Sequence, residues 1–201
     1  MRFDLGKLLK AQLMLVVFLL CGCVFTDTPM LTSADADMVP FREGYYTLFS
    51  TPTYLKVQGG RVLLLREAGD EVDQEVVVKA LGNGLYLMQK GAVNEGRRMY
   101  GLMRFSADGK SAELSFVSCG RDEYATVFML AGMTPTGSGR ECTLRNATPA
   151  RLFRAYSLIA SRFSHALVWD YRLQPDEQPG AAARFEAEAQ RRAAAKLQQK
   201  P

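Results

Sequence analysis

The sequence predicts an α+β fold, in which an antiparallel β meander of about eight strands, forming a curled sheet or a small barrel, is followed by one packed amphipathic helix and a charged C-terminal tail. Two observations lead to this prediction. Between residues 41 and 132, short apolar runs are separated by turn residues at intervals of about 8 to 15 residues, which is typical of antiparallel strands joined by short turns. After residue 148, large apolar residues recur at helical spacing instead.

Residue pairs that favour tight turns separate the apolar runs of the meander. Gly-Gly at 59–60, Asn-Gly at 83–84 and Asp-Gly at 108–109 can adopt the positive φ angles that two-residue hairpin turns require. Curling or closing the resulting sheet hides the unpaired edges that an open sheet presents to solvent. The expected strands cover residues 44–50, 54–58, 61–67, 74–81, 85–90, 98–105, 111–119 and 124–132.

A helix is predicted to begin at Thr148 and Pro149. The threonine side chain can cap the first backbone N–H groups of the helix, and proline suits its first turn. Large apolar residues then share one face, and this face needs a partner such as the β-sheet. They are Leu152, Tyr156, Ile159, Phe163 and Leu167.

The C-terminal residues 174–201 are predicted to form a charged tail that is partly helical or disordered. Residues 174–180, QPDEQPG, have the composition of a linker. Residues 181–200 are rich in Ala, Glu, Gln, Lys and Arg, which favour helix, but Phe185 and Leu197 are their only large apolar residues. Burial of these two side chains cannot offset the entropy cost of ordering the segment. We therefore expect the isolated tail to be mobile.

The N-terminus has the pattern of an export signal. A basic start that includes Arg2, Lys7 and Lys10 precedes a run that is uncharged from Ala11 to Phe25. A helix that crosses a bilayer needs about 20 consecutive apolar residues, so this shorter run is better explained as the apolar part of a signal peptide.

The end of the apolar run, Leu20-Cys21-Gly22-Cys23, has an aliphatic residue, two small residues and a cysteine in that order. This segment resembles the signal peptide of bacterial lipoproteins. The resemblance implies that residues 1–22 are removed and that Cys23 becomes lipidated. Ordinary cleavage without lipid and an uncleaved membrane anchor are the alternatives.

Together, the resemblance and the composition suggest four regions. Residues 1–22 form the signal peptide, and residues 23–40 form a lipidated N-terminus and a flexible tether. The tether includes TDTPMLTSADADMVP, which is rich in Thr, Ser, Asp and Pro and has no apolar period. Residues 41–173 then form a single globular α+β domain, and residues 174–201 form the charged tail.

The cysteine count and the charge limit the compartment and the partners. With Cys23 lipidated, Cys119 and Cys142 are an even pair in a compartment that permits disulfides, so we expect them to be bonded, with two buried thiols as the alternative. The formal net charge of +4 is spread along the chain rather than gathered into a basic stripe, which argues against a nucleic-acid partner.

No motif for catalysis, metal binding or cofactor binding is found. His165 is the only histidine, which excludes multi-histidine metal sites, and Ser161 and Asp170 near it lack the strained turn and oxyanion donors of a serine nucleophile site. The acidic residues 67–75 lack EF-hand spacing, and the glycines of residues 137–140 lack the ending of a phosphate loop. We therefore expect a protein without enzymatic activity, metal or cofactor.

The expected function follows from the expected cellular location and from the fold. Inner-membrane retention of such lipoproteins commonly involves Asp after the lipidated cysteine; Val24 follows here, so the resemblance implies an outer-membrane anchor with the domain facing the periplasm. We expect a non-catalytic protein-interaction or assembly module with an envelope protein as partner. The alternative is a lipocalin-like carrier of an apolar small molecule, since small barrels rich in aromatic residues can enclose one ligand.

Overall fold

The computed structural model describes residues 23–37, 41–48, 51–58, 61–65, 74–92, 96–137, 141–163, 167, 169 and 171–198. The predicted signal peptide, residues 1–22, lies outside the described residues.

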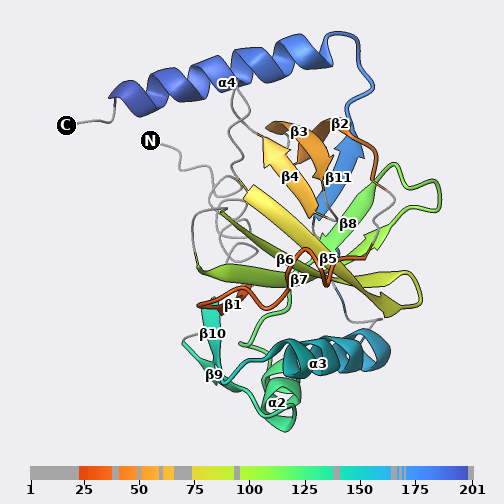
Figure 1. Cartoon of the computed structure of the whole chain (residues 1–201), viewed down its shortest axis with the longest axis vertical. Helices are drawn as coiled ribbons and strands as arrows, with labels where there is room; N and C mark the ends of the chain where they lie inside the picture. Colours follow the sequence, from red (N-terminus) through yellow and green to blue (C-terminus); the bar gives the residue numbers. More distant parts are fainter. Residues whose placement is uncertain are drawn as a thin grey trace, which may run out of the picture.

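Eight antiparallel strands close into a β-barrel, which confirms the predicted α+β fold with a small barrel (Figure 1). Seven of them follow one another along the chain as the predicted meander. The strand β6 pairs with β7, and β11 lies between β8 and β2, so the described strands leave no free edge in this ring. The barrel strands are β2 (Gly44–Leu48), β3 (Thr51–Gln58), β4 (Arg61–Leu65), β5 (Gln74–Gly82), β6 (Leu85–Ala92), β7 (Arg98–Phe105), β8 (Ala112–Ser115) and β11 (Tyr171–Pro175).

The eighth strand was predicted in the wrong place. Residues 124–132, expected as a strand, lie mostly in helix α2 (Asp122–Leu130). Its buried residues Tyr124, Val127 and Phe128 are spaced by three and four positions, so they share one helix face, and two acidic residues in the first turn suit a helix N-terminus. The barrel is instead closed by β11, whose Leu173 is buried in the barrel core. The domain boundary expected after residue 173 therefore falls inside a barrel strand.

Residues 23–40 were expected to form a flexible tether, but residues 23–37 of this segment are packed against the barrel instead. Cys23–Thr26 form β1, which pairs antiparallel with β7 and parallel with β10 (Glu141–Arg145). A further short strand, β9 (Thr134–Thr136), pairs with β10. Val24 is fully buried, so the segment is held by apolar packing as well as by backbone hydrogen bonds. Composition could not reveal this, because the pairing partners lie far away in the sequence.

Strand β7 changes partner along one of its edges. Its first residues pair with β1, and the residues from Leu102 onward pair with β8. Gly101 lies at the change, where a Cβ atom would stand 2.9 Å from the Ser115 carbonyl oxygen and 3.1 Å from the Phe116 ring. A glycine is therefore needed for the close approach of the two chains at this point.

Alternate residues of the barrel wall face two different apolar cores. Met103 of β7 points into the barrel, whereas Tyr100 and Leu102 belong to an outer core that α2 and α3 cover. Helix α3 (Pro149–Arg162) begins as predicted, with the Thr148 side chain accepting a hydrogen bond from the Arg151 N–H at 3.3 Å. Leu152, Tyr156 and Ile159, three residues of the predicted stripe, are buried in the outer core.

Two further features fix the outer elements. The predicted disulfide between Cys119 and Cys142 is present, and it joins the chain just before α2 to β10. Helix α4 (Ala181–Gln198) lies on the opposite side of the barrel from α2 and α3 (Figure 1). Phe185 of α4 is 8% exposed and packs against Leu63 and Leu65. The expected mobile tail is thus packed on the barrel through its first turns.

Replacing Phe185 tests this packing. We expect Phe185→Ala to lower the free energy of unfolding by about 2 to 3 kcal/mol, because the ring is removed from its apolar contacts with β4 and with Tyr45 and Tyr54. Urea denaturation of the full chain measures the change. Glu186→Ala, at the exposed neighbouring position, is the control and should change stability by less than about 0.5 kcal/mol. Equal stability of the two variants would contradict the packing of α4.

Candidate functional site

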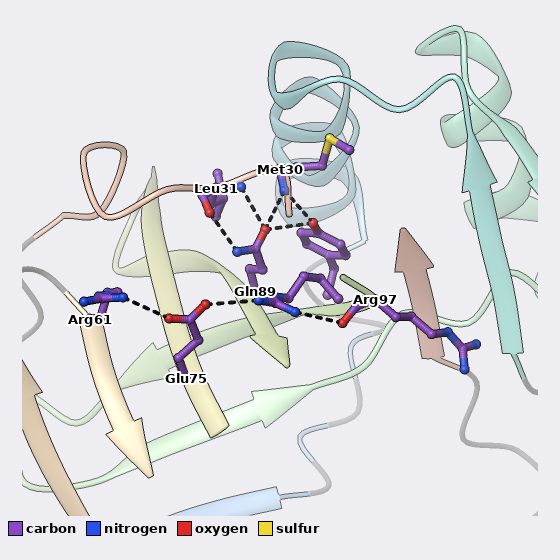
Figure 2. A network of polar contacts seen from close by, with 8 residues as sticks. Met30, Leu31, Arg61, Glu75, Gln89 and Arg97 are labelled. Atoms are coloured by element: carbon purple, nitrogen blue, oxygen red, sulfur yellow. Dashed lines mark hydrogen bonds and ion pairs between the residues drawn. The ribbon is translucent and has the colours of Figure 1, made fainter. Parts of the chain in front are cut away.

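A buried glutamine holds the segment that follows β1 against the barrel. Gln89 of β6 is 1% exposed, and its Oε1 accepts hydrogen bonds from the N–H groups of Met30 at 2.7 Å and Leu31 at 2.8 Å (Figure 2). Its Nε2 donates to the Leu31 carbonyl oxygen at 2.8 Å. The amide side chain thus satisfies three backbone groups that have no strand beside them. The segment is bound to the barrel by specific polar contacts.

Tyr100 of β7 completes this contact. Its hydroxyl donates to Gln89 Oε1 at 2.8 Å, lies 3.1 Å from Thr26 Oγ1, and accepts from the Met30 N–H at 3.1 Å. Burial raises the pKa of Tyr100 to about 12, against a smaller lowering by the hydrogen bonds to Thr26 and Met30. The phenol therefore keeps its proton at neutral pH and remains a donor. We call Gln89 and Tyr100, with residues 26–31, the N-terminal clamp.

A charged cluster lies beside the clamp. Glu75 of β5 accepts hydrogen bonds from Arg98 at 3.2 Å and from Arg61 at 3.3 Å, each on a different carboxylate oxygen (Figure 2). Arg98 is 4% exposed, so its charge requires this carboxylate nearby. Gly91 faces Glu75 across the sheet, and a Cβ atom there would stand 2.5 Å from Arg98 Cδ. The cluster connects β4, β5 and β7 at the end of the barrel near β1.

Cys23 is the first residue of β1 and is half-buried. Burial alternates along the strand, with Val24 and Thr26 inside and Cys23 and Phe25 on the more open face. The Arg97 guanidinium lies 3.8 Å from the centre of the Phe25 ring and pairs with Glu141 at 3.0 Å. A group attached to the Cys23 sulfur would therefore leave from the side of β1 that faces away from the core.

Side chains of the described residues fill most of the barrel interior that they line. The cavity inside it measures about 30 Å³. Its described lining is apolar apart from Lys90, and it includes the flexible side chains of Met88 and Met103. A cavity of about 150 Å³ accommodates benzene, whereas about 10 to 15 Å³ suffices for one water molecule. This cavity has room for a water molecule, and a larger ligand would require lining side chains, of which Met88 and Met103 are the most flexible, to move.

The other residues considered in the sequence are not brought into a reactive arrangement within the described residues. Ser161 is exposed at the end of α3 and donates a hydrogen bond to the Leu158 carbonyl oxygen at 3.1 Å. His165 and Asp170 lie outside the described residues, as do residues 67–73 and 138–140. Among the described residues, no three of His, Cys, Asp and Glu come together in a way that could hold a metal ion.

Sequence reasoning missed the clamp and the charged cluster. A polar residue within the apolar run LYLMQ was the available signal for Gln89, but its partners are backbone groups some 58 positions away. The ion pair of Glu75 and Arg98 could not be predicted from the sequence, because both residues lie at strand ends, where charged residues are usually solvated.

Comparisons with known proteins do not assign a family. No family model, no curated protein and no solved structure matches this chain. Within the part of the chain that the structure describes, no helix combines the length and the apolar character needed to cross a membrane. The functional proposal therefore rests on the residues and their geometry.

Replacing Gln89 tests the clamp. We expect Gln89→Leu to lower the free energy of unfolding by about 3 kcal/mol, since it leaves the Leu31 N–H and carbonyl without their partner in a buried place. Urea denaturation measures the loss, with the exposed Gln190→Leu in α4 as the matched control. A loss below about 0.5 kcal/mol, as expected for the control, would show that other contacts hold residues 26–31.

Proposed function

We propose that this chain is a lipid-anchored envelope protein that acts as a non-catalytic interaction or assembly module, facing the periplasm from the outer membrane. The observation that carries the proposal is the position of Cys23. This residue ends the lipoprotein-like motif at residues 20–23 and also begins β1, which is hydrogen-bonded into the sheet on both sides.

This position has a mechanical consequence for anchoring. Because Cys23 is itself the first residue of β1, no flexible linker lies between the anchor and the sheet. An acyl group on Cys23 would therefore hold the domain directly against the lipid surface. The N-terminal clamp would secure the chain just beyond the anchor. The partly exposed side of Cys23 supports the proposal, since acyl chains could leave without disturbing Val24 and the core.

The disulfide and the filled interior further support this role. A disulfide between Cys119 and Cys142 suits an oxidising compartment outside the cytoplasm. The small cavity favours binding by the outer surface over carriage of a ligand inside the barrel. Helix α4 is a suitable contact surface for a partner, because it stands out from the barrel and its described buried residues, Phe185 and Ala189, share one face.

The second candidate function is lipocalin-like binding of an apolar small molecule, with which the barrel fold is compatible. The observation in its favour is that Met88 and Met103, two adaptable side chains, line the small apolar cavity. An apolar molecule that co-purifies with the protein, and is lost in Met88→Trp, would favour this candidate.

Metabolic labelling tests the anchor. We expect a clickable fatty-acid analogue to label the full chain in its bacterial host, and Cys23→Ser to abolish the label, because this thiol is the only acceptor that the motif provides. Cys21→Ala is the matched control and should keep the label. A label that persists in Cys23→Ser would contradict lipidation at this residue.

Photo-crosslinking in the same cells tests the interaction role. A crosslinking residue at the exposed position Gln190 of α4 should capture one defined envelope protein, and capture should weaken at least about tenfold when Cys23→Ser removes the anchor, because anchoring raises the local concentration of partner. The same crosslinker at Asp108, in the β7–β8 turn, is the control. Equal capture at both positions, or none at Gln190, would count against α4 as the contact surface.

A further inference from the structure

A groove on the outside of the barrel is independent of the clamp and of the barrel interior. Its volume is about 480 Å³, which lies in the range of small-molecule sites. Four parts of the chain meet there: the β5–β6 turn at residues 83–84 with Leu85 at the start of β6, residues 104–105 at the end of β7, residues 160–161 at the end of α3, and Trp169. The groove thus lies at the junction between the barrel and α3.

Arg104 is held in a fixed position within this groove. Its guanidinium carbon lies 4.3 Å from the centre of the Trp169 ring, and its Nε donates to Glu113 Oε2 at 2.6 Å. The other oxygen of Glu113 accepts from Arg172 at 2.6 Å. These hydrogen bonds from Arg172 and Arg104 lower the pKa of Glu113, so its carboxylate stays charged at neutral pH. Stacking and the ion pair together restrict the arginine before any ligand arrives.

The outer edge of Arg104 remains available to a ligand. Its side chain is 46% exposed, and within the described residues its two Nη groups make no hydrogen bond, since Glu113 uses only Nε. A guanidinium edge with two parallel N–H groups matches the two oxygens of a carboxylate. The groove therefore offers a preorganised anion partner.

The rest of the described lining sets the chemical class of the ligand. It contains no carboxylate, so Arg104 gives the groove a positive charge, and the cluster of Arg104, Glu113 and Arg172 has one cation in excess. Leu85 and Trp169 supply apolar surface beside this charge, and Asn83 and Ser161 add polar groups, whereas the Phe105 ring packs into the barrel core against Phe41. A positive group next to an aromatic and aliphatic surface suits a molecule that is anionic at one end and apolar at the other.

We propose that this groove binds a small carboxylic acid that carries an apolar ring or chain. The carboxylate would pair with the Nη groups of Arg104, and the apolar part would lie against Leu85 and the Trp169 indole. The assignment does not depend on lipidation or on a protein partner, because it uses none of the residues that support those roles.

Trp169 makes the test direct, since it is the only tryptophan in the chain and its fluorescence reports on this groove alone. The full chain is titrated with phenylacetate and, separately, with phenylacetamide, which has the same shape and no charge. We expect phenylacetate to change the fluorescence saturably with a dissociation constant of about 1 mM, as befits a ligand of this size, and phenylacetamide to bind at least about tenfold more weakly. Equilibrium dialysis with radiolabelled ligands gives the same comparison without relying on fluorescence.

Three variants complete the experiment. Arg104→Gln should weaken phenylacetate binding at least about tenfold and leave phenylacetamide unchanged, whereas Arg104→Lys should restore part of the affinity. Arg154→Gln, which removes an exposed arginine of α3 outside the groove, should leave both affinities within about twofold. Near-ultraviolet circular dichroism and melting curves establish that Arg104→Gln is folded, as expected because Glu113 keeps Arg172 as its partner. Equal binding of the acid and the amide, unchanged binding in Arg104→Gln, or no binding by either method at 20-fold the expected constant would overturn the proposal.

Discussion

Closure of the barrel by β11 is the constraint on which the other elements depend. The strands β2 to β8 follow one another, but β2 and β8 do not meet, and residues 171–175 fill the space between them with antiparallel pairing on both sides. The chain between Phe116 and Asp170 must therefore leave the barrel after β8 and return to the same gap. This excursion contains α2, β9, β10, the disulfide and α3, and it packs on the outer wall where Tyr100 and Leu102 face outward. The outer core exists because the last barrel strand is supplied so late in the sequence.

The parts of the fold that could be predicted from sequence are those specified locally. Alternating apolar residues and turn pairs such as Asn83-Gly84 located β2 to β8, and the Thr148 cap located α3. The strand predicted for residues 124–132 was wrong because a short apolar run suits a strand as well as a helix. The three-and-four spacing of Tyr124, Val127 and Phe128 becomes a buried helix face through the packing of α2 against α3 and β9. Strand β11 was missed because its alternation is short, with only Tyr171 and Leu173 as large apolar residues before the linker that follows.

The candidate sites, like the fold, could be predicted only where nearby residues or simple counting specify them. The cysteine pair could be inferred by counting, since a disulfide needs only two thiols and an oxidising compartment. The contacts of Gln89 with Leu31, and of Arg104 with Trp169, join residues that lie far apart along the chain, and no local pattern specifies them. The interactions of such polar groups are strong because the groups are removed from water and held beside fixed partners. Both conditions arise only after the strands are in register.

The position of β1 determines when the protein can finish folding. This strand is the first of the described strands, yet it pairs with β7 at residues 98–100 and with β10 at residues 141–143, and the ring closes only at residues 171–175. When the chain is synthesised from its N-terminus, β1 therefore has neither of its neighbours until β7 appears, and the barrel stays open until residues 171–175 appear. Non-local pairing of this kind makes folding slow and leaves sheet edges exposed in the meantime. The order of elements along the chain thus creates a period in which the emerging protein is prone to aggregation. During this period it depends on other molecules that shield its exposed sheet edges.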